Sequence, residues 1–485
     1  TRQFEPAPEL ARLRADLDHP IVDADAHQME STPAVLDFLA DVAGPAMCDT
    51  WLAYLANSRR VFSMTPEERA DTRTTVPVWW PIPAENTLDR ATSSLPALLY
   101  ERLDEIGLDF TVVYPGMGML TIMLPGIADD DLRRSIVRAF NNYYAEVFAG
   151  FEDRMTPAAV VPMHTPAEAV EELEHIVGTL GLKAALFAGD VLRPIPAFAR
   201  DHPELAGHLV YQDCFGIDSP YDYDEVWSAC ERLRIAPTFH SGPIGRGSRA
   251  SISRHQYNQL GGFAEGGEAV CKSLVFGGVT RRFPNLRFGF LEGGSGWASI
   301  LYSRLIDHWK KRNAEAILHL DPARVDTALL SELIDDYAHP AVRKHRDRTV
   351  ADATWGDRME ELDDWRLCEA TSAEDFVELF AERCYFGCEA DDRSTSTAFD
   401  TALNPFGARL GAMLGSDIGH FDVADMREIV LEAYELVDDG LISTDDFRDY
   451  AFANAVRLHG TANPDFFTGT VVEAAAATVL RAEGA

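Results

Sequence analysis

The chain has 485 residues, of which 46% are hydrophobic and 25% are charged, and its 78 acidic and 43 basic side chains give a formal net charge of −35. So acidic a chain argues against nucleic acid or an anionic membrane as the main partner, because both attract basic surfaces. A chain of this length also closes a large hydrophobic core without needing disulfides or a structural metal.

Short apolar runs recur along the chain, and each leads into a loop that carries Gly, Asp or His. Longer amphipathic stretches separate these runs, which is typical of β/α units around a buried parallel sheet. Eight such runs favour an α/β fold of the (β/α)8 TIM-barrel type over an open doubly wound sheet, and no G-x-G-x-x-G motif follows the first run. The predicted strands are residues 21–27, 109–116, 155–163, 182–189, 236–242, 285–294, 383–390 and 411–420.

Residues 131–150 and 165–181 show the 3.6-residue apolar spacing of amphipathic helices, and the second begins with a Thr-Pro pair suited to a helix start. Two connections, residues 28–108 and 295–382, are too long for simple crossovers. We interpret them as elaborations over the barrel mouth that form a lid or a substrate pocket. Peripheral decoration and an oligomer contact are the alternatives for both insertions.

A single metal-dependent barrel domain is therefore predicted over residues 21–465. Residues 1–20 are expected to form an N-terminal extension, and the Ala-rich residues 466–485 a C-terminal helix. No apolar signal region or membrane span of about 18 residues is visible. The seven irregularly spaced cysteines indicate reduced thiols, so we expect a soluble cytoplasmic protein.

Side chains that bind metals follow several of the predicted strands. The first strand ends with Asp25 and His27, which the two-residue period of a strand places on the same side. His240, Glu292 and Asp417 follow later strands. One such residue alone is more often a loop cap than a ligand, but the carboxyl ends of all barrel strands meet at one face. Together these five residues predict a metal site.

Three further side chains, Glu30, Glu389 and His420, lie near the same strand ends and are less certain metal ligands. The candidate catalytic residues are Glu292, Asp417 and His420, because carboxylates and imidazoles transfer protons and each follows a predicted strand.

A basic, glycine-rich segment follows His240 and contains Arg246, Arg249 and Arg254. Arginines beside an active site suit the phosphates of a substrate, so these three are candidate substrate-binding residues. The alternative is a solvated loop whose arginines pair with the many acidic side chains.

The motifs VDADAHQMES, TFHSG, FGGVTRRFPNLRFGFLEGGSGW, GSDIGHFD and NAVRLHG resemble those of the amidohydrolase superfamily, in its aminocarboxymuconate-semialdehyde-decarboxylase-like branch. The resemblance covers most of residues 20–465. It implies a TIM barrel in which Asp25, His27, His240 and Asp417 bind the metal.

The chain also departs from the better-known hydrolases and decarboxylases that it resembles. Those enzymes have His-x-His on the first strand, where this chain has Asp25 and His27, and a catalytic His on the sixth, where it has Glu292. The bridging Lys or Glu of dinuclear members is missing after strand 182–189. Oxygen-rich sites suit ions such as iron or manganese more than zinc, and mixed carboxylate and imidazole sets hold nonheme di-iron centres.

That ligand set resembles a minority branch, the TIM-barrel nonheme di-iron monooxygenases of platensimycin and platencin biosynthesis. This resemblance implies an oxidoreductase with two iron ions that hydroxylates an apolar, diterpenoid-like acyl group linked to coenzyme A. An external electron donor, a reductase or ferredoxin, would then be a partner, and a homo-oligomer is compatible with the sequence. The alternative is a hydrolase or nonoxidative decarboxylase that uses Zn or Mn, and a noncatalytic binding protein is the third hypothesis.

Overall fold

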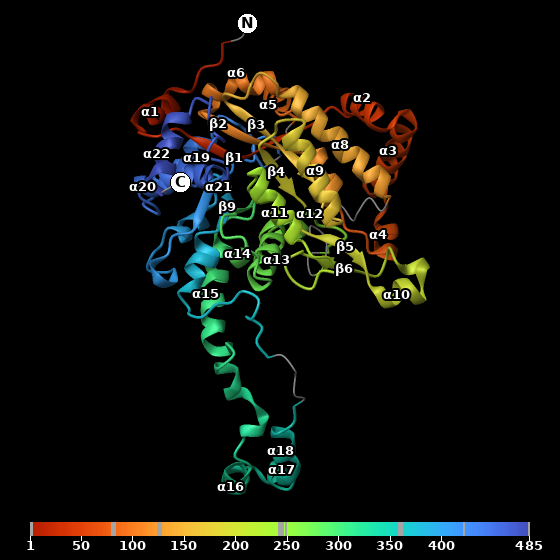
Figure 1. Ribbon diagram of the computed structural model, residues 1–485, viewed down its shortest axis with the longest axis vertical. Helices are drawn as coiled ribbons and strands as arrows, with labels where there is room; N and C mark the ends of the chain where they lie inside the picture. The colour runs from red at the N-terminus through yellow and green to blue at the C-terminus, as the bar shows by residue number, and fades with distance from the viewer. Residues whose placement is uncertain are drawn as a thin grey trace.

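The computed structural model describes residues 3–78, 84–123, 129–240, 247, 250–356, 362–420 and 422–483. Eight parallel strands follow one another around a barrel, and helices surround it (Figure 1). They are β1 (Val22–Gln28), β2 (Phe110–Pro115), β3 (Met155–Val161), β4 (Ala184–Phe187), β7 (Pro237–Phe239), β8 (Phe288–Phe290), β9 (Cys384–Cys388) and β10 (Gly411–Leu414). Each overlaps one of the predicted runs, so the predicted (β/α)8 barrel is confirmed.

The strands are continuous apolar runs because both of their faces are covered. All residues of β2, β3 and β4 are buried, as expected for parallel strands enclosed by helices. An aromatic row crosses neighbouring strands, where the Phe239 ring lies 5.6 Å from that of Phe290 and the Phe290 ring 6.0 Å from that of Phe386. Trp297, from the helix that follows β8, packs against this row and ties the helical layer to the barrel.

The barrel closes between its first and last strands through backbone hydrogen bonds at the carboxyl ends. The amide of Asp417 donates to the carbonyl oxygen of Asp25 at 2.9 Å, and the amide of His27 donates to that of Ile418 at 2.9 Å. The pairing of β1 with β2 shifts its register between Asp23 and Ala26. The seam between β1 and the segment after β10 brings residues from opposite ends of the chain to the same rim.

Most helices lie in the connections between strands, and two of them match the predicted ones. The helix α8 spans Asp130–Val147, and α9 spans Pro166–Gly178 with Thr165 as its N-cap. The other helices around the barrel after β2 are α7 (Met117–Met123), α10 (Pro196–Asp201), α11 (Asp224–Leu233), α12 (His255–Gln259), α13 (Gly262–Phe276), α14 (Val279–Arg282), α19 (Ile429–Asp438), α20 (Thr444–Arg448), α21 (Asn454–Ala462) and α22 (Glu473–Glu483).

A two-stranded antiparallel hairpin after β4, which the sequence analysis did not predict, consists of β5 (Val191–Pro194) and β6 (Val210–Asp213). Arg193 of the hairpin pairs with Asp213 and donates a 2.8 Å hydrogen bond to the Tyr223 hydroxyl.

No helix in the described ranges is long and apolar enough to cross a membrane.

The helices before β2 are α1 (Pro8–Asp16), α2 (Thr32–Ala43), α3 (Pro45–Ser58), α4 (Pro66–Thr72), α5 (Thr87–Thr92) and α6 (Pro96–Ile106). The first insertion, after β1, contains α2 to α6. Its helix α2 packs on α8, where the rings of Phe38 and Tyr143 meet edge to face at 5.7 Å. The described part of this insertion is therefore joined to the barrel's helical layer.

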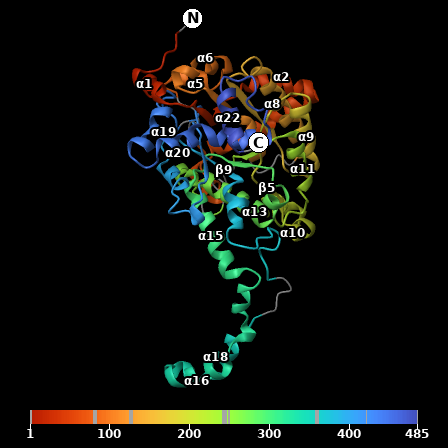
Figure 2. The same cartoon turned by 60° about the vertical axis from the view of Figure 1, so that its left-hand side comes forward.

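The second insertion leaves the body of the molecule (Figures 1 and 2). It begins with α15 (Gly296–Arg312) and continues into α16 (Thr327–Tyr337), α17 (Pro340–Arg343) and α18 (Arg346–Ala353), which lie at its far end. We call residues 313–356 the arm. At the base of the insertion, Trp365 is buried against Phe276 and Phe376, and its indole N–H donates to the carbonyl oxygen of Arg312 at 3.2 Å.

Candidate metal centre

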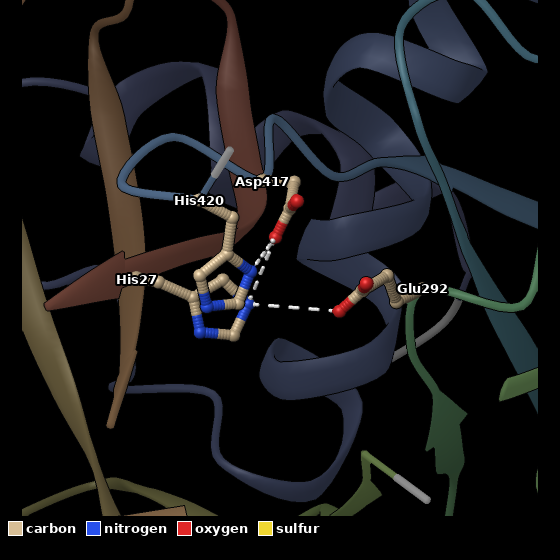
Figure 3. Close-up of side chains that lie close together, drawn as sticks. All are labelled: His27, Glu292, Asp417 and His420. Carbon is tan, nitrogen blue, oxygen red and sulfur yellow. Dashed lines mark ion pairs between the residues drawn. The ribbon is translucent and has the colours of Figure 1, made fainter. Parts of the chain in front are cut away.

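Five predicted ligands meet at the rim, and Figure 3 shows three of them with His420. The Nε2 atom of His27 lies 3.4 Å from Oδ1 of Asp25 and 3.3 Å from Oδ1 of Asp417. The Nε2 atom of His240 lies 2.8 Å from Oε2 of Glu292 and 3.2 Å from Nε2 of His27. Strand ends that are distant in sequence thus direct carboxylate oxygens and imidazole nitrogens at one small volume.

The donor atoms of this cluster fit a cation. None of the five side chains is more than 5% exposed. Several of their oxygens, namely Oδ1 of Asp25, Oε2 of Glu292 and both carboxylate oxygens of Asp417, have no hydrogen-bond partner among the described residues. Burying such oxygens without a partner is costly, and carboxylates with imidazoles are what divalent metal ions bind. The residues present therefore fit a metal ion, in two overlapping groups that share His27.

The titration of these groups shows the same need for positive charge. Burial, with the nearby carboxylates of Asp417, Asp23 and Glu389, raises the pKa of Asp25 well above its ordinary value. Burial and Asp417 likewise raise the pKa of Glu292. Burial lowers the pKa of His240 to about 3, so this imidazole is neutral and has a nitrogen lone pair available. A bound cation would reverse the cost of ionising these carboxyl groups.

Glu292 and Asp417 both occupy left-handed backbone conformations, with φ of 56° and 49°. Such a φ is uncommon outside glycine and costs on the order of 1 kcal/mol or more. At Asp417 the backbone hydrogen bond to Asp25 helps to hold this conformation. Strain at two ligands of one cluster is typical of a functional site.

Asp23 lies beneath the cluster and holds the two sides of the seam together. Its carboxylate accepts hydrogen bonds from the Ser416 amide at 2.9 Å and the Ser416 hydroxyl at 2.7 Å. It also accepts from the Thr111 hydroxyl at 2.9 Å and the Asp25 amide at 3.1 Å. The two-residue period places Asp23 on the same side of the strand as Asp25 and His27, but the sequence alone does not indicate that Asp23 supports the seam instead of joining the ligands.

His420 joins the cluster, as predicted with less certainty. Its Nδ1 atom lies 2.6 Å from Oδ1 of Asp417, and its ring stacks on that of His27 at 3.9 Å between centroids (Figure 3). Burial alone would lower the pKa of His420, but the carboxylates of Asp417, Asp422 and Glu389 together outweigh burial, and the net shift of the pKa is upward. Asp417 and His420 therefore form a pair that can share a proton.

Glu30 is not part of the cluster. Its carboxylate accepts hydrogen bonds from the amides of Gly116, Met117 and Gly118 at 3.1, 2.7 and 3.2 Å, and from the Tyr144 hydroxyl at 2.5 Å. The Glu30 carboxylate thus caps the amides at the start of α7, and its oxygens are already occupied by these donors and the Tyr144 hydroxyl. Glu30 is therefore a structural residue rather than the reserve ligand that the sequence analysis expected.

A cavity of about 380 Å³ borders the cluster at Glu292, and Glu389 lines its wall. Burial, with Asp417 and Asp422, raises the pKa of Glu389 to about 8, but Glu389 belongs to neither ligand group. No described residue that lines this cavity comes from the insertions 28–108 and 295–382. The lining residues are Gln256, Gln259, Leu260, Gly261, Phe263, Ala264, Glu292, Gly293, Gly294, Glu389, Asp392 and Asp422.

Of the three predicted phosphate-binding arginines, Arg254 lies in the described part of the chain, and it does not line the cavity. Arg254 is exposed at the N-cap of α12, and its guanidinium donates to the carbonyl oxygen of Ser253 at 3.0 Å. Arg246 and Arg249 lie outside the described residues, and their role stays a prediction.

Over residues 22–387 the chain matches the family model described as Amidohydrolase. The chain belongs to the amidohydrolase family. Similar solved structures include an amidohydrolase from Mycobacterium avium subsp. paratuberculosis, with a TM-score of 0.52 and 16% identity over 92% of this chain and 100% of that chain. A dihydroxybenzoic acid decarboxylase from Polaromonas sp. JS666, solved with manganese and 2-nitroresorcinol, has a TM-score of 0.48 and 16% identity over 93% of this chain and 99% of that chain.

A 5-carboxyvanillate decarboxylase from Sphingomonas paucimobilis has a TM-score of 0.46 and 13% identity over 91% of this chain and 98% of that chain. At these identities the likeness concerns the barrel fold.

The amidohydrolase match corrects the main functional hypothesis from the sequence. We expected an oxidoreductase, a nonheme di-iron monooxygenase of antibiotic biosynthesis, and this expectation is wrong: the family match contradicts it and agrees with the hydrolase or decarboxylase alternative. The physical reason lies in the reserve carboxylates. Glu30 is bound by backbone amides, and Glu389 belongs to neither ligand group, so these two carboxylates do not add to the oxygen ligands that the hypothesis counted in reserve.

Proposed function

We propose that this chain is a metal-dependent nonoxidative decarboxylase, which removes a carboxyl group from a small organic acid as CO2. The observation that carries the proposal is the convergence of buried carboxylate oxygens that lack hydrogen-bond partners with two imidazole nitrogens at the barrel rim. Membership of the amidohydrolase family supports a metal-dependent reaction rather than an oxygenation.

The residues that would hold the metal are Asp25, His27, His240, Glu292 and Asp417. Carboxylates outnumber imidazoles in this set, which suits an ion that accepts oxygen ligands, and we propose manganese ahead of zinc. When bound, such an ion supplies a Lewis acid that orients and polarises the oxygens of an acidic substrate. The adjoining cavity of about 380 Å³ has the size of a site for a small molecule.

Loss of CO2 breaks a carbon–carbon bond and leaves its electron pair on the remaining carbon, which must then gain a proton. Asp417 and His420, 2.6 Å apart, are the groups placed to hold that proton in the cluster that the cavity borders at Glu292. His27 stacks on His420 and fixes the plane of its ring. We assign proton delivery to this pair because the short contact between Nδ1 of His420 and Oδ1 of Asp417 holds two titratable groups together.

The test uses metal-free protein reloaded with one equivalent of Mn(II) or Zn(II) under anaerobic conditions. Carboxylated phenols are the first panel, because the decarboxylases of similar fold act on such acids. We expect CO2 release without O2, and one solvent deuterium in the product when the reaction runs in D2O. Dependence of turnover on O2, or the absence of CO2 from every acid that binds the loaded protein, would contradict the proposal.

Hydrolysis is the second candidate, favoured by one observation. The Oδ1 atom of Asp417 contacts His420, but its Oδ2 atom has no hydrogen-bond partner among the described residues, and this oxygen could act as a general base towards water. A hydrolase would cleave amide or ester substrates anaerobically and would incorporate solvent ¹⁸O into the acid product. The two candidates are therefore separated by the product alone.

A further inference from the structure

The arm is too small and too exposed to be stable through its own core. Ile334 is the only buried residue in the arm, all of which the structure describes. Units of about 40 residues or fewer usually need a disulfide, a metal or oligomerisation to remain folded. The arm also stands clear of the barrel in both views, so the barrel does not cover its tip (Figures 1 and 2).

One side of α16 is an apolar stripe that the described residues leave open. Leu329, Leu333 and Tyr337 are spaced four residues apart, which aligns them on one face of the helix. Their exposed fractions are 50%, 44% and 82%, whereas Ile334, on the neighbouring side, is 7% exposed. An aligned run of exposed apolar side chains of this kind marks a surface that contacts another protein. We call Leu329, Leu333 and Tyr337 the tip stripe.

The charges around the tip stripe indicate what kind of protein surface would bind it. Acidic Glu332 and Asp336 lie beside the tip stripe on α16, whereas residues 343–348 read RKHRDR and are strongly basic in a chain of net charge −35. Within one chain, Arg346 and Asp335, 2.7 Å apart, make the one ion pair found between these two described segments. The tip thus has an acidic side and a basic side that remain largely unpaired with each other.

We propose that the arm tip binds the arm tip of a second copy of this chain, forming a symmetric dimer. A two-fold axis would place α16 of each copy against the basic segment of the other. Each contact between an acidic and a basic side chain would then occur twice, with the two copies exchanged. The two tip stripes would be buried between helices, as in a small helical bundle. The surface is self-complementary, which a single unrelated partner would not require.

Sedimentation equilibrium of the full-length chain gives the first test. We expect a monomer–dimer equilibrium, and Leu333→Glu should raise the dimer dissociation constant by about tenfold or more. Ala328→Glu is the matched control, because it adds the same charge to the opposite side of α16 and should leave the constant within about twofold. Circular dichroism of both variants checks that the chain remains folded. A strictly monomeric chain, or a dimer that Leu333→Glu leaves unchanged, overturns the proposal.

A charge exchange tests the symmetric arrangement itself. Reversing α16 with Glu332→Arg and Asp336→Arg should weaken the dimer, since both facing segments are then basic. Adding Arg343→Glu and Arg348→Glu to the same chain should restore it to within about threefold of the original constant. Tighter association of the first variant overturns the proposal, because it would mean that the tip docks on the acidic body of another copy. Failure of the second variant to recover overturns it as well.

Discussion

The barrel rim buries polar atoms without hydrogen-bond partners, whereas the arm exposes apolar side chains to solvent. At the rim, apolar packing is complete, yet carboxylate oxygens of Asp25, Glu292 and Asp417 are buried without hydrogen-bond partners. In the arm, polar groups reach solvent, yet Leu329 and Tyr337 expose apolar surface. The buried oxygens suit a cation, and the exposed apolar side chains suit another protein surface. The comparison shows that the kind of group left unsatisfied indicates the chemistry of what binds.

The largest effect is expected from removing a ligand at the rim. His240→Ala should lower the affinity for Mn(II) by more than about 100-fold and abolish turnover, because it deletes a donor and leaves Glu292 without its nearest contact. Metal content by mass spectrometry and titration against a chelator measure this. Glu30→Gln is the control, and it should keep the metal while lowering the free energy of unfolding by about 1–3 kcal/mol. Full metal retention in His240→Ala would show that His240 is not a metal ligand.

The seam beneath the rim should give the next largest effect. Asp23→Ala leaves the hydroxyls of Thr111 and Ser416 and two backbone amides without their acceptor, so we expect a loss of about 2–3 kcal/mol in the free energy of unfolding. Metal affinity should also fall, by about tenfold, because Asp25 is no longer held in register. Denaturant titration gives the first quantity, and an unchanged midpoint would show that Asp23 does not support the rim.

A smaller, pH-dependent effect is expected at Glu389 in metal-free protein. The folded state holds its proton up to a pKa of about 8, whereas the unfolded state releases it near the ordinary value of 4.5. Ionisation of Glu389 therefore lowers the stability of the wild-type protein as pH rises through this window, and the neutral Glu389→Gln variant lacks this contribution. The advantage of the variant should grow to about 1 kcal/mol by pH 8 and then level off, since solvent in the cavity reduces the full effect.

Thermal unfolding of both Glu389 proteins between about pH 5 and pH 9 measures this difference. If the stability advantage of Glu389→Gln over the wild-type protein shrinks as pH rises, the raised pKa of Glu389 is contradicted.

The smallest effect is expected on the arm of the monomer. At concentrations where the chain does not associate, Leu333→Ala should change the free energy of unfolding by less than about 0.5 kcal/mol, because its side chain is already exposed. Phe290→Ala in the buried aromatic row should instead cost about 3–5 kcal/mol. Denaturant titration of both variants compares the two regions directly, and a large loss from Leu333→Ala would mean that the arm packs on its own body.

The sequence predicted the barrel, and the residues that meet at its rim, because both depend on local patterns. A parallel strand covered on both faces reads as an uninterrupted apolar run, and the polar residue that ends it faces the rim, as His240 does after β7. The short, half-exposed strand Val191–Pro194 has no such pattern, so the hairpin was missed. His420 could be placed near the rim, but its contact with Asp417 depends on the turn between them.

Two features could not be predicted from local patterns. Glu30 follows the strand that carries Asp25 and His27, as a ligand would, but donors from α7 and Tyr144, distant in sequence, bind its carboxylate. Counting Glu30 among the ligands favoured the di-iron hypothesis. The second insertion reads as ordinary helices, and nothing in its period indicates that α16 projects from the barrel instead of covering it.

The seam between β1 and the segment after β10 has a consequence for how the protein is made. Asp25 and His27 leave the ribosome early, and Asp417 follows only when nearly the whole barrel has been synthesised. During translation the first strand therefore waits with its final neighbour absent and its acidic end open to water. A nascent chain arrested before residue 411 can fold helices and pair strands, but it cannot yet assemble the candidate metal centre, because Asp417 is not yet part of it.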